Sequence, residues 1–147
     1  QRQIDGIILA CSHMSASKTG AHIVITQQQG LNEYADTGEV VDAAISARMI
    51  ENIFFKNTPL HDGAMLISAG RIYAAACILP ISKRQDLPKH FGLRHRAALG
   101  ITEKTDAIAI VVSEETGRIS VAQGDSIHTV TTNELEHKYL APVYGIS

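Results

Sequence analysis

A histidine and an aspartate stand side by side in the stretch NTPLHDGAMLISAG, Asn57 to Gly70. His61 and Asp62 lie there between a proline and an apolar run. An imidazole and a carboxylate on stiff backbone can bind a divalent ion and activate a hydroxyl group. Asp-Gly is also a strong turn signal, so a tight turn with an exposed histidine would explain the same residues. The other polar clusters of the chain bear on this choice.

Two arginines bracket a histidine in the second cluster, Arg94-His95-Arg96. We predict a helix from about Leu93 to Gly100, so the cluster falls near a helix N-terminus. Free N–H groups and the positive end of the helix dipole attract phosphate there, and arginine adds a planar fork of donors. The alternative is a solvated helix face with no ligand.

The third cluster, Ser113-Glu114-Glu115, follows the apolar run AIAIVV. Two adjacent carboxylates at a strand end can hold a divalent ion, although an ordinary hairpin end has the same composition. Together, His61, Asp62 and a glutamate could bind Mg²⁺ or Mn²⁺ while the arginines bind phosphates. That combination suits phosphoryl or nucleotidyl transfer. The sequence has neither G-x-x-x-x-G-K-[ST] nor G-x-G-x-x-G, so a nucleotide would have to be held in another way.

The apolar periodicity predicts the elements that must position these clusters. Polar residues 27–42 indicate a surface loop, and Thr131 with Glu134 forms a capping box. The predicted elements, in chain order, are a helix over 4–14, a strand over 21–26, a helix over 43–55 with Ile45, Met49 and Ile53 on one face, a hairpin of 64–68 and 72–79, a helix over 93–100, a hairpin over 106–125 that turns at 115–117, and a helix over 133–140. We therefore expect an α+β fold, a mixed central β-sheet flanked by helices, in one domain spanning residues 1–147.

Composition limits the possible ligands and the setting of the protein. The 147 residues carry a formal net charge of −2 and no long basic run, so duplex nucleic acid is not an expected partner. Cys11 and Cys77 each lie in an apolar context and are expected to be small buried side chains. No apolar run reaches the roughly 20 residues that span a bilayer. Because the chain begins with Gln1, we expect it to be cut from something longer, from which an anchor could have been removed.

Three longer segments give these clusters a family resemblance: LHDGAM from Leu60, GLRHRAALGITEKTDA from Gly92 and VVSEETGRISVAQGD from Val111. They closely resemble the diadenylate cyclase domain. The similarity extends through KTGAHIVI, GLNEYADTG and IFFKNTPLHDGA, and so covers nearly the whole chain. The sequences of the loops and helices are most similar to those of the membrane-anchored branch of that family.

The resemblance implies that two ATP molecules are condensed into cyclic di-AMP with release of pyrophosphate. It implies a divalent metal, Mn²⁺ or Mg²⁺ with Co²⁺ as a further candidate, and a position at the cytoplasmic face of a bacterial membrane through an N-terminal anchor. Its motifs assign catalysis to Asp62 with Gly63 and Ala64, ATP binding to Leu79, Leu93, Arg94, His95, Arg96, Ser113 and Glu115, and metal binding to His61 and Glu114, with Glu115 as an adjacent metal candidate.

The sequence departs from the family pattern at two positions. Leu93 stands where many relatives have threonine before the RHR motif, which removes a hydroxyl hydrogen bond worth about 1 kcal/mol. Ile78 stands where some relatives have tyrosine before the adenine-contacting leucine, so base stacking would be weaker. We expect both changes to affect nucleotide affinity and not the class of reaction.

The chain has one DGA and one RHR motif, yet the product requires two reciprocal attacks. We therefore expect a face-to-face homodimer with two-fold symmetry. Two other classes stay open at this point. An HD-type phosphohydrolase could use His61 and Asp62, although His90 and His95 do not supply a familiar spacing. A nucleotide-sensing module would bind ATP without chemistry, although it would have no need for Asp62 and Glu114.

Overall fold

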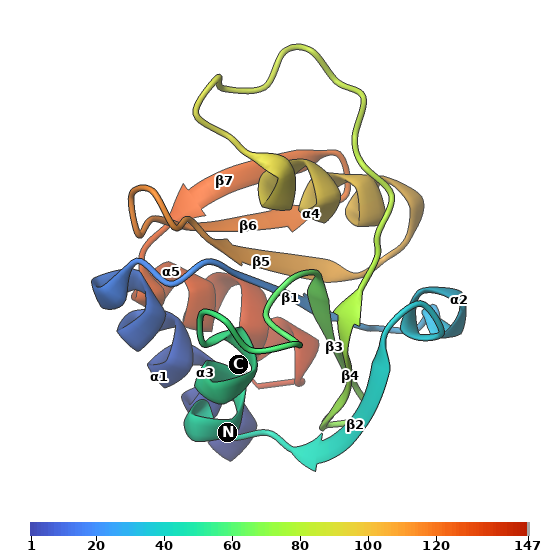
Figure 1. The fold of residues 1–147 in the computed structure, drawn as a ribbon, viewed down its shortest axis with the longest axis vertical. Helices are drawn as coiled ribbons and strands as arrows, with labels where there is room; N and C mark the ends of the chain where they lie inside the picture. Colours follow the sequence, from blue (N-terminus) through green and yellow to red (C-terminus); the bar gives the residue numbers. More distant parts are fainter. Residues whose placement is uncertain (147) are drawn as a thin grey trace.

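A seven-stranded mixed sheet forms the middle of the molecule, in the order β2-β4-β3-β1-β5-β6-β7 (Figure 1). The computed structural model describes residues 1–146. The elements are α1 (Arg2–Ser17), β1 (Ala21–Ile25), α2 (Asn32–Ala35), β2 (Glu39–Ala44), α3 (Ala47–Phe54), β3 (Ala64–Ser68), β4 (Arg71–Cys77), α4 (Leu93–Lys104), β5 (Ile108–Val112), β6 (Ile119–Gln123), β7 (Ser126–Val130), α5 (Thr132–Glu134), the π-helix η1 (Leu135–Leu140) and α6 (Ala141–Val143). The predicted α+β class is confirmed.

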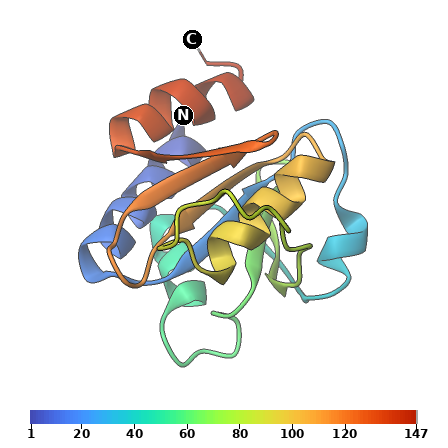
Figure 2. The ribbon, with the colours of Figure 1, turned by 90° about the horizontal axis from the view of Figure 1, so that it is seen from above.

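Side chains alternate across the central strands, so the sheet has a core on each face. In β1, Ile23 and Ile25 pack into the cluster shared with α1, α3 and η1, whereas Val24 packs into the cluster shared with α2 and α4. Figures 1 and 2 show α4 on one side of the strands and α1 with the C-terminal helices on the other. The central strands are buried on both sides, which explains why their sequences are continuously apolar.

Strand direction determines which loops meet. Within the described part of the chain, β1 and β3 are the one parallel pair, while β3–β4 and β1–β5 are antiparallel. The starts of β1 and β3 and the ends of β4 and β5 therefore lie on the same side of the sheet, at the ends of its strands. The predicted N-terminal helix, both predicted hairpins and the Thr131–Glu134 capping box are confirmed.

The prediction of a surface loop over 27–42 is wrong. That stretch contains α2 and most of β2, an edge strand whose side chains are largely exposed. The pattern of a half-buried strand is missing there because β2 has a neighbour on one side only and bends at a bulge. Its exposure leaves Val40 69% accessible.

The predicted helix over 43–55 begins later, at Ala47, because Ala43 and Ala44 complete β2. The Ser46 hydroxyl then caps α3 by accepting a hydrogen bond from the Met49 N–H at 3.1 Å. The buried face of α3 consists of Ile50, Ile53 and Phe54, so the predicted inward position of Met49 is wrong.

Helix α4 does not end at Gly100 as predicted but continues to Lys104. A Cβ at Gly100 would lie 1.9 Å from the Pro80 carbonyl oxygen, so this glycine serves close packing and not helix termination. Strand β7 was not predicted. Cys11 and Cys77 are buried, as predicted. No helix in residues 1–146 combines the length and the apolar character needed to cross a bilayer.

Candidate active site

The three polar clusters of the sequence lie at the same end of the central strands. Ala21 pairs with Val112 and Ala64 pairs with Cys77, so the residues just outside these four positions are neighbours. The HDG segment precedes β3, and the Ser-Glu-Glu segment follows β5. Helix α4 packs on the adjacent face and contributes its N-terminal turn. The fold thus gathers groups that are more than fifty residues apart in the chain.

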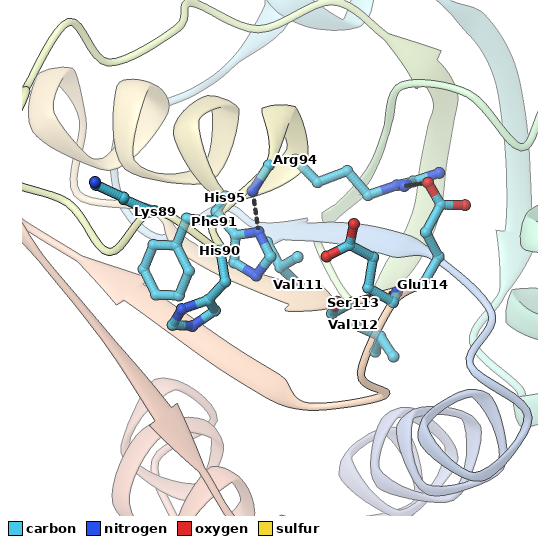
Figure 3. A pocket seen from close by; sticks show the side chains of 11 residues that line it. Lys89, His90, Phe91, Arg94, His95, Val111, Val112, Ser113 and Glu114 are labelled. Carbon is cyan, nitrogen blue, oxygen red and sulfur yellow. Dashed lines mark hydrogen bonds and ion pairs between the residues drawn. The ribbon is translucent and has the colours of Figure 1, made fainter.

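A cavity of about 220 Å³ lies between the first turn of α4 and the end of β5 (Figure 3). Its lining combines imidazole, guanidinium and carboxylate groups with an apolar floor. The lining residues are Lys89, His90, Phe91, Gly92, Arg94, His95, Val111, Val112, Ser113, Glu114 and Glu115. Of the predicted ATP-binding residues, Arg94, His95, Ser113 and Glu115 border this cavity, and so does the predicted metal ligand Glu114.

An ion pair joins the two walls of the cavity. Arg94 Nη1 lies 3.3 Å from Glu114 Oε1, and Figure 3 shows the long arginine side chain reaching across to the glutamate. The Arg94 side chain is 25% exposed and that of Glu114 65%. A pair this accessible contributes little to stability, so both groups are available to a ligand at small cost.

The His95 imidazole is buried at the N-terminal end of α4. The Gly92 N–H donates to His95 Nδ1 at 3.1 Å, a contact drawn as a dashed line in Figure 3. Burial, followed by the positive charges of His90 and Arg94, lowers the pKa of His95 to about 4. The side chain is therefore a neutral imidazole near pH 7, and the cations that line the cavity are Arg94 and Lys89.

Arg96 is directed elsewhere. Its Nη1 donates to the carbonyl oxygens of Arg84 at 2.6 Å and Ser82 at 3.5 Å, and the Ser82 N–H donates to the Arg96 carbonyl at 2.9 Å. Arg96 does not line the cavity. The structure therefore places it where it fixes the segment that leads from β4 to α4, and its predicted contact with a triphosphate stays a prediction.

The Ser113 hydroxyl organises the turn that carries the two glutamates. Its Oγ accepts hydrogen bonds from the N–H groups of Glu115 and Thr116, both at 3.2 Å. The Ser113 N–H donates to the Arg118 carbonyl at 3.0 Å, which closes the hairpin. Both carboxylates are therefore presented from a backbone that side-chain and main-chain bonds hold in place.

His61 and Asp62 form a second pair outside the cavity lining. His61 Nδ1 donates to the Thr58 carbonyl at 2.7 Å, because a carbonyl oxygen can only accept. The lone pair of neutral His61 therefore lies on Nε2, which is 3.2 Å from Asp62 Oδ1. The Asp62 side chain is 85% exposed. The Asp62 carboxylate thus faces solvent and is more exposed than that of Glu114.

Gly63 and Ala64 connect the His61–Asp62 pair to strand β3. Gly63 has φ of 90°, and a Cβ there would lie 2.8 Å from the carbonyl carbon of Ala76 in the neighbouring strand β4. Only glycine fits such a position. Ala64 is 1% exposed and begins β3.

Three predicted or noted positions stand apart from the cavity. Leu79 is 6% exposed and packs in the core beside α4. Leu93 and Ile78, the two departures from the family pattern, are each 70% exposed and do not line the cavity. The Ile78 N–H donates to the Thr37 hydroxyl at 2.8 Å, which fixes the backbone next to Leu79.

Among residues 1–146, no three His, Cys, Asp or Glu side chains come together closely enough to hold a metal ion. The predicted metal ligands His61 and Glu114 lie in two separate ion pairs instead, His61 with Asp62 and Glu114 with Arg94. The chemistry of His61, Asp62 and Glu114 fits a hard divalent ion, since they offer carboxylate oxygens and the Nε2 of an imidazole whose Nδ1 is engaged by a carbonyl. A single subunit does not bring them to one point.

Sequence reasoning missed two parts of the site. Residues 89–92 lie where a polar stretch leads into the predicted helix and were not expected in the site, yet they form one wall of the cavity. His22 is hidden within an apolar strand, is 2% exposed and leaves Nε2 without a hydrogen-bond partner among the described residues. Burial and the nearby positive charges of Arg94 and His95 lower the pKa of His22 to about 3. No feature of the sequence marked either part.

A guanidinium and two carboxylates around a small cavity at a helix N-terminus, on a mixed α+β sheet, suit a phosphorylated ligand. Residues 8–127 match the family described as DAC, DisA bacterial checkpoint controller nucleotide-binding. The chain belongs to this family, as its motifs predicted.

Known relatives agree with this assignment. The chain is 43% identical over 134 residues to the cyclic di-AMP synthase CdaA of Bacillus subtilis, and 44% identical over 137 residues to a diadenylate cyclase of Listeria monocytogenes. These matches cover 91% and 93% of this chain but 49% and 50% of the relatives, so the chain spans about half their length.

Solved structures share the fold. A double mutant of DacA from Staphylococcus aureus superimposes with a TM-score of 0.93 at 39% identity, covering 97% of this chain and 95% of that one. A protein from Bacillus cereus, described as a hypothetical membrane spanning protein, gives 0.83 at 42% identity, covering 86% of this chain and 62% of the other.

Proposed function

We propose that this domain is a diadenylate cyclase that condenses two ATP molecules into cyclic di-AMP and two diphosphates. The observation that carries the proposal is the outward position of Asp62 beside a cavity with an Arg94–Glu114 wall. The cavity offers phosphate-binding groups, and the exposed carboxylate is suited to act on a nucleotide held by a facing subunit. The names of the Bacillus and Listeria relatives support the same reaction.

The chemistry consists of two equivalent substitutions. The 3′-oxygen of each ribose attacks the α-phosphorus of the other ATP, one P–O bond forms and the bond to the diphosphate breaks. Asp62 accepts the proton that the 3′-hydroxyl loses, as a general base. An aspartate with 85% of its side chain exposed can reach such a hydroxyl without moving buried groups.

The two walls of the cavity would hold the phosphates. Arg94 supplies a charged donor fork, and the first turn of α4 supplies backbone N–H groups. Glu115 borders the same space and would orient the ligand through its hydroxyl groups or metal. Arg96 would act indirectly, by holding the segment that carries residues 89–92.

The adenine would lie toward the end of β4, against the backbone of Leu79. The exposed Ile78 and Leu93 side chains offer aliphatic surface there without a hydroxyl or an aromatic ring. Base recognition in this chain would therefore depend on the backbone and on shape. That arrangement favours adenine less strongly than a side chain placed to hydrogen-bond the base would.

A divalent ion, Mn²⁺, Mg²⁺ or Co²⁺, would be held by His61 Nε2 and the carboxylates of Asp62 and Glu114. When bound, such an ion favours ionisation of the 3′-hydroxyl and offsets charge on the α-phosphate. The requirement for a divalent ion follows the family, and the choice of metal is our proposal. His61 is prepared for this role because the Thr58 carbonyl already engages its other ring nitrogen.

Two domains would face each other across a two-fold axis, so that each presents its Asp62 to the site between them. Monomers would bind ATP and turn over only as this pair. In the full-length protein, an N-terminal anchor would hold the domain at the cytoplasmic face of the membrane. The description of the Bacillus cereus relative as membrane spanning supports that position.

The test is product identification by mass spectrometry after incubation of concentrated protein with ATP and either Mn²⁺ or Mg²⁺. We expect cyclic di-AMP from the parent protein, none from Asp62→Asn, and ATP binding by both. AMP or free phosphate as the product would replace the cyclase with a hydrolase. Binding without any product, at concentrations where the dimer is established, would replace it with a nucleotide sensor.

A further inference from the structure

The ring of Phe91 lies flat against the ring of His95. Their centroids are 4.4 Å apart and their planes differ by 4°. The His90 ring contacts the Phe91 ring edge-on, with the two centroids 4.9 Å apart and an interplanar angle of 78°. Figure 3 shows the three rings together on one side of the cavity, opposite the Arg94–Glu114 wall. Phe91 has no direct role in the proposed chemistry.

A second contact fixes which nitrogen of His95 carries the proton. The Gly92 N–H donates to Nδ1, so Nδ1 must be the unprotonated nitrogen and the ring hydrogen lies on Nε2. A tilt of the imidazole out of its plane would break the stack on Phe91, and a half-turn of the ring would break the contact with Gly92. Because Phe91 and Gly92 are adjacent, one short segment makes both contacts with His95: the ring of Phe91 stacks on the face of the imidazole, and the Gly92 N–H bonds to its Nδ1.

We propose that Phe91 is a positioning residue that holds the neutral imidazole of His95 so that its Nε2–H donates to a phosphate oxygen of the bound nucleotide. Two facts favour this use of the imidazole over simple packing. His95 lines the cavity although it is 6% exposed, and the hydrogen on its Nε2 is not used by the Gly92 contact. The identity of the ligand as ATP rests on the proposed function.

Arg94 and His95 have different roles in this proposal. Arg94 is a charged donor at the cavity, and His95 is an uncharged donor with a fixed direction. A neutral N–H adds a hydrogen bond without another positive charge beside Arg94. The stack is the means of fixing its direction, since stacked aromatic rings attract each other beyond the effect of the area they bury.

Two readouts test the proposal: the ¹⁵N chemical shifts of the His95 ring and the kinetics with ATP. The parent protein should show a protonated Nε2 and an unprotonated Nδ1. Phe91→Ala should give a mixture of tautomers and raise the KM for ATP roughly three- to tenfold, with kcat within about twofold. Phe91→Tyr, which restores a stacking ring, should return both readouts toward the parent values.

A double-mutant cycle separates positioning from general damage to the fold. In a His95→Gln background, Phe91→Ala should cause no further rise in KM. The proposal is overturned if Phe91→Ala leaves the His95 signals and KM unchanged, or if it raises KM equally when His95 is absent.

The same cycle can be run on ATP binding alone, measured by calorimetry. Coupling between Phe91 and His95 in binding, with no cyclic dinucleotide formed by the parent protein, would support the positioning role and reject the cyclase. A cyclase without that coupling would do the reverse.

Discussion

The guanidinium group of Arg94 lies directly against the backbone of Gly20, the residue before β1. A Cβ at position 20 would stand 2.6 Å from Arg94 Cζ, 2.7 Å from Nη1 and 2.8 Å from Nη2. Side chains do not approach one another this closely, so the missing Cβ is what lets the arginine lie flat there. Because the same guanidinium reaches Glu114 at 3.3 Å, Gly20 determines where the positive charge of the site is held.

Gly20→Ala should therefore reduce nucleotide affinity without unfolding the domain. The backbone at this position does not need positive φ, and the atoms that must move belong to the end of a flexible side chain. We expect the Kd for ATP to rise roughly tenfold, which corresponds to losing one charge-assisted hydrogen bond. Calorimetric titration measures the affinity, and the melting temperature should change by no more than about two degrees.

Gly30→Ala is the matched control, because a Cβ at Gly30 would have nothing within 4 Å. It should leave ATP affinity and melting temperature at parent values. Equal affinity of the Gly20 and Gly30 variants for ATP would show that the position of Arg94 does not matter for binding.

Arg96→Ala should loosen the segment between β4 and α4. The substitution removes the donor to the carbonyl oxygens of Ser82 and Arg84. We expect faster amide hydrogen exchange over residues 82–92 and a rise in the KM for ATP, because that segment carries one wall of the cavity. A hydrogen bond from a charged group is worth about 1.5–3 kcal/mol, and partial exposure places this one at the lower end.

Lys104→Ala provides the comparison for Arg96, since it removes an exposed cation from the last turn of the same helix. Exchange over residues 82–92 should be unaltered in that variant. If Arg96→Ala raises KM while exchange in this segment stays as in the parent protein, the side chain acts on the ligand directly and not through the segment.

Much of the site was visible in the sequence because its residues are of chemically unusual types. His61 with Asp62, Arg94 with His95, and the two glutamates interrupt apolar runs, and the fold brings all three groups to one sheet edge. The spacing of these residues in the sequence does not show which side chains form ion pairs with each other. The sequence suggested Glu114 with His61, whereas in the subunit Glu114 meets Arg94.

Features that depend on distant contacts were not predictable. Strand β2 exists because β4 offers it an edge, and its own residues are too polar and too exposed to indicate a strand. Gly100 resembled a helix end, but its role depends on the approach of Pro80 from outside the helix. Phe91 stands just before the predicted helix, and its importance appears only when the ring of His95 lies against it.

Mixtures of parent protein with excess Asp62→Asn should release a linear dinucleotide. A mixed pair has one carboxylate and can form one phosphodiester, so the product keeps a triphosphate at one end. Mass spectrometry would detect it together with one diphosphate for each bond formed. Because Asp62 is 85% exposed, the variant should melt at the parent temperature. If dilution with the variant lowers cyclic di-AMP only in proportion to the amount of parent protein, with no linear product, a single subunit completes the reaction.

Two buried histidines make the free energy of unfolding depend on pH. The pKa of His22 is lowered to about 3 and that of His95 to about 4, both from 6.5. The unfolded chain therefore binds more protons than the native one below pH 6.5. Stability is fully present above that pH and is lost progressively as the pH falls toward 3.

His22→Leu should remove one part of this acid sensitivity. The free energy of unfolding should fall less steeply between pH 6 and pH 4, by up to about 1.4 kcal/mol per pH unit, which is the effect of one proton. At pH 7 the variant should be at least as stable as the parent, because Nε2 of His22 has no partner to lose. Urea unfolding at several pH values measures the slope, with His128→Gln, on the exposed edge strand β7, as the control. An unchanged slope in His22→Leu would mean that His22 takes up its proton in the folded protein as readily as in the unfolded chain.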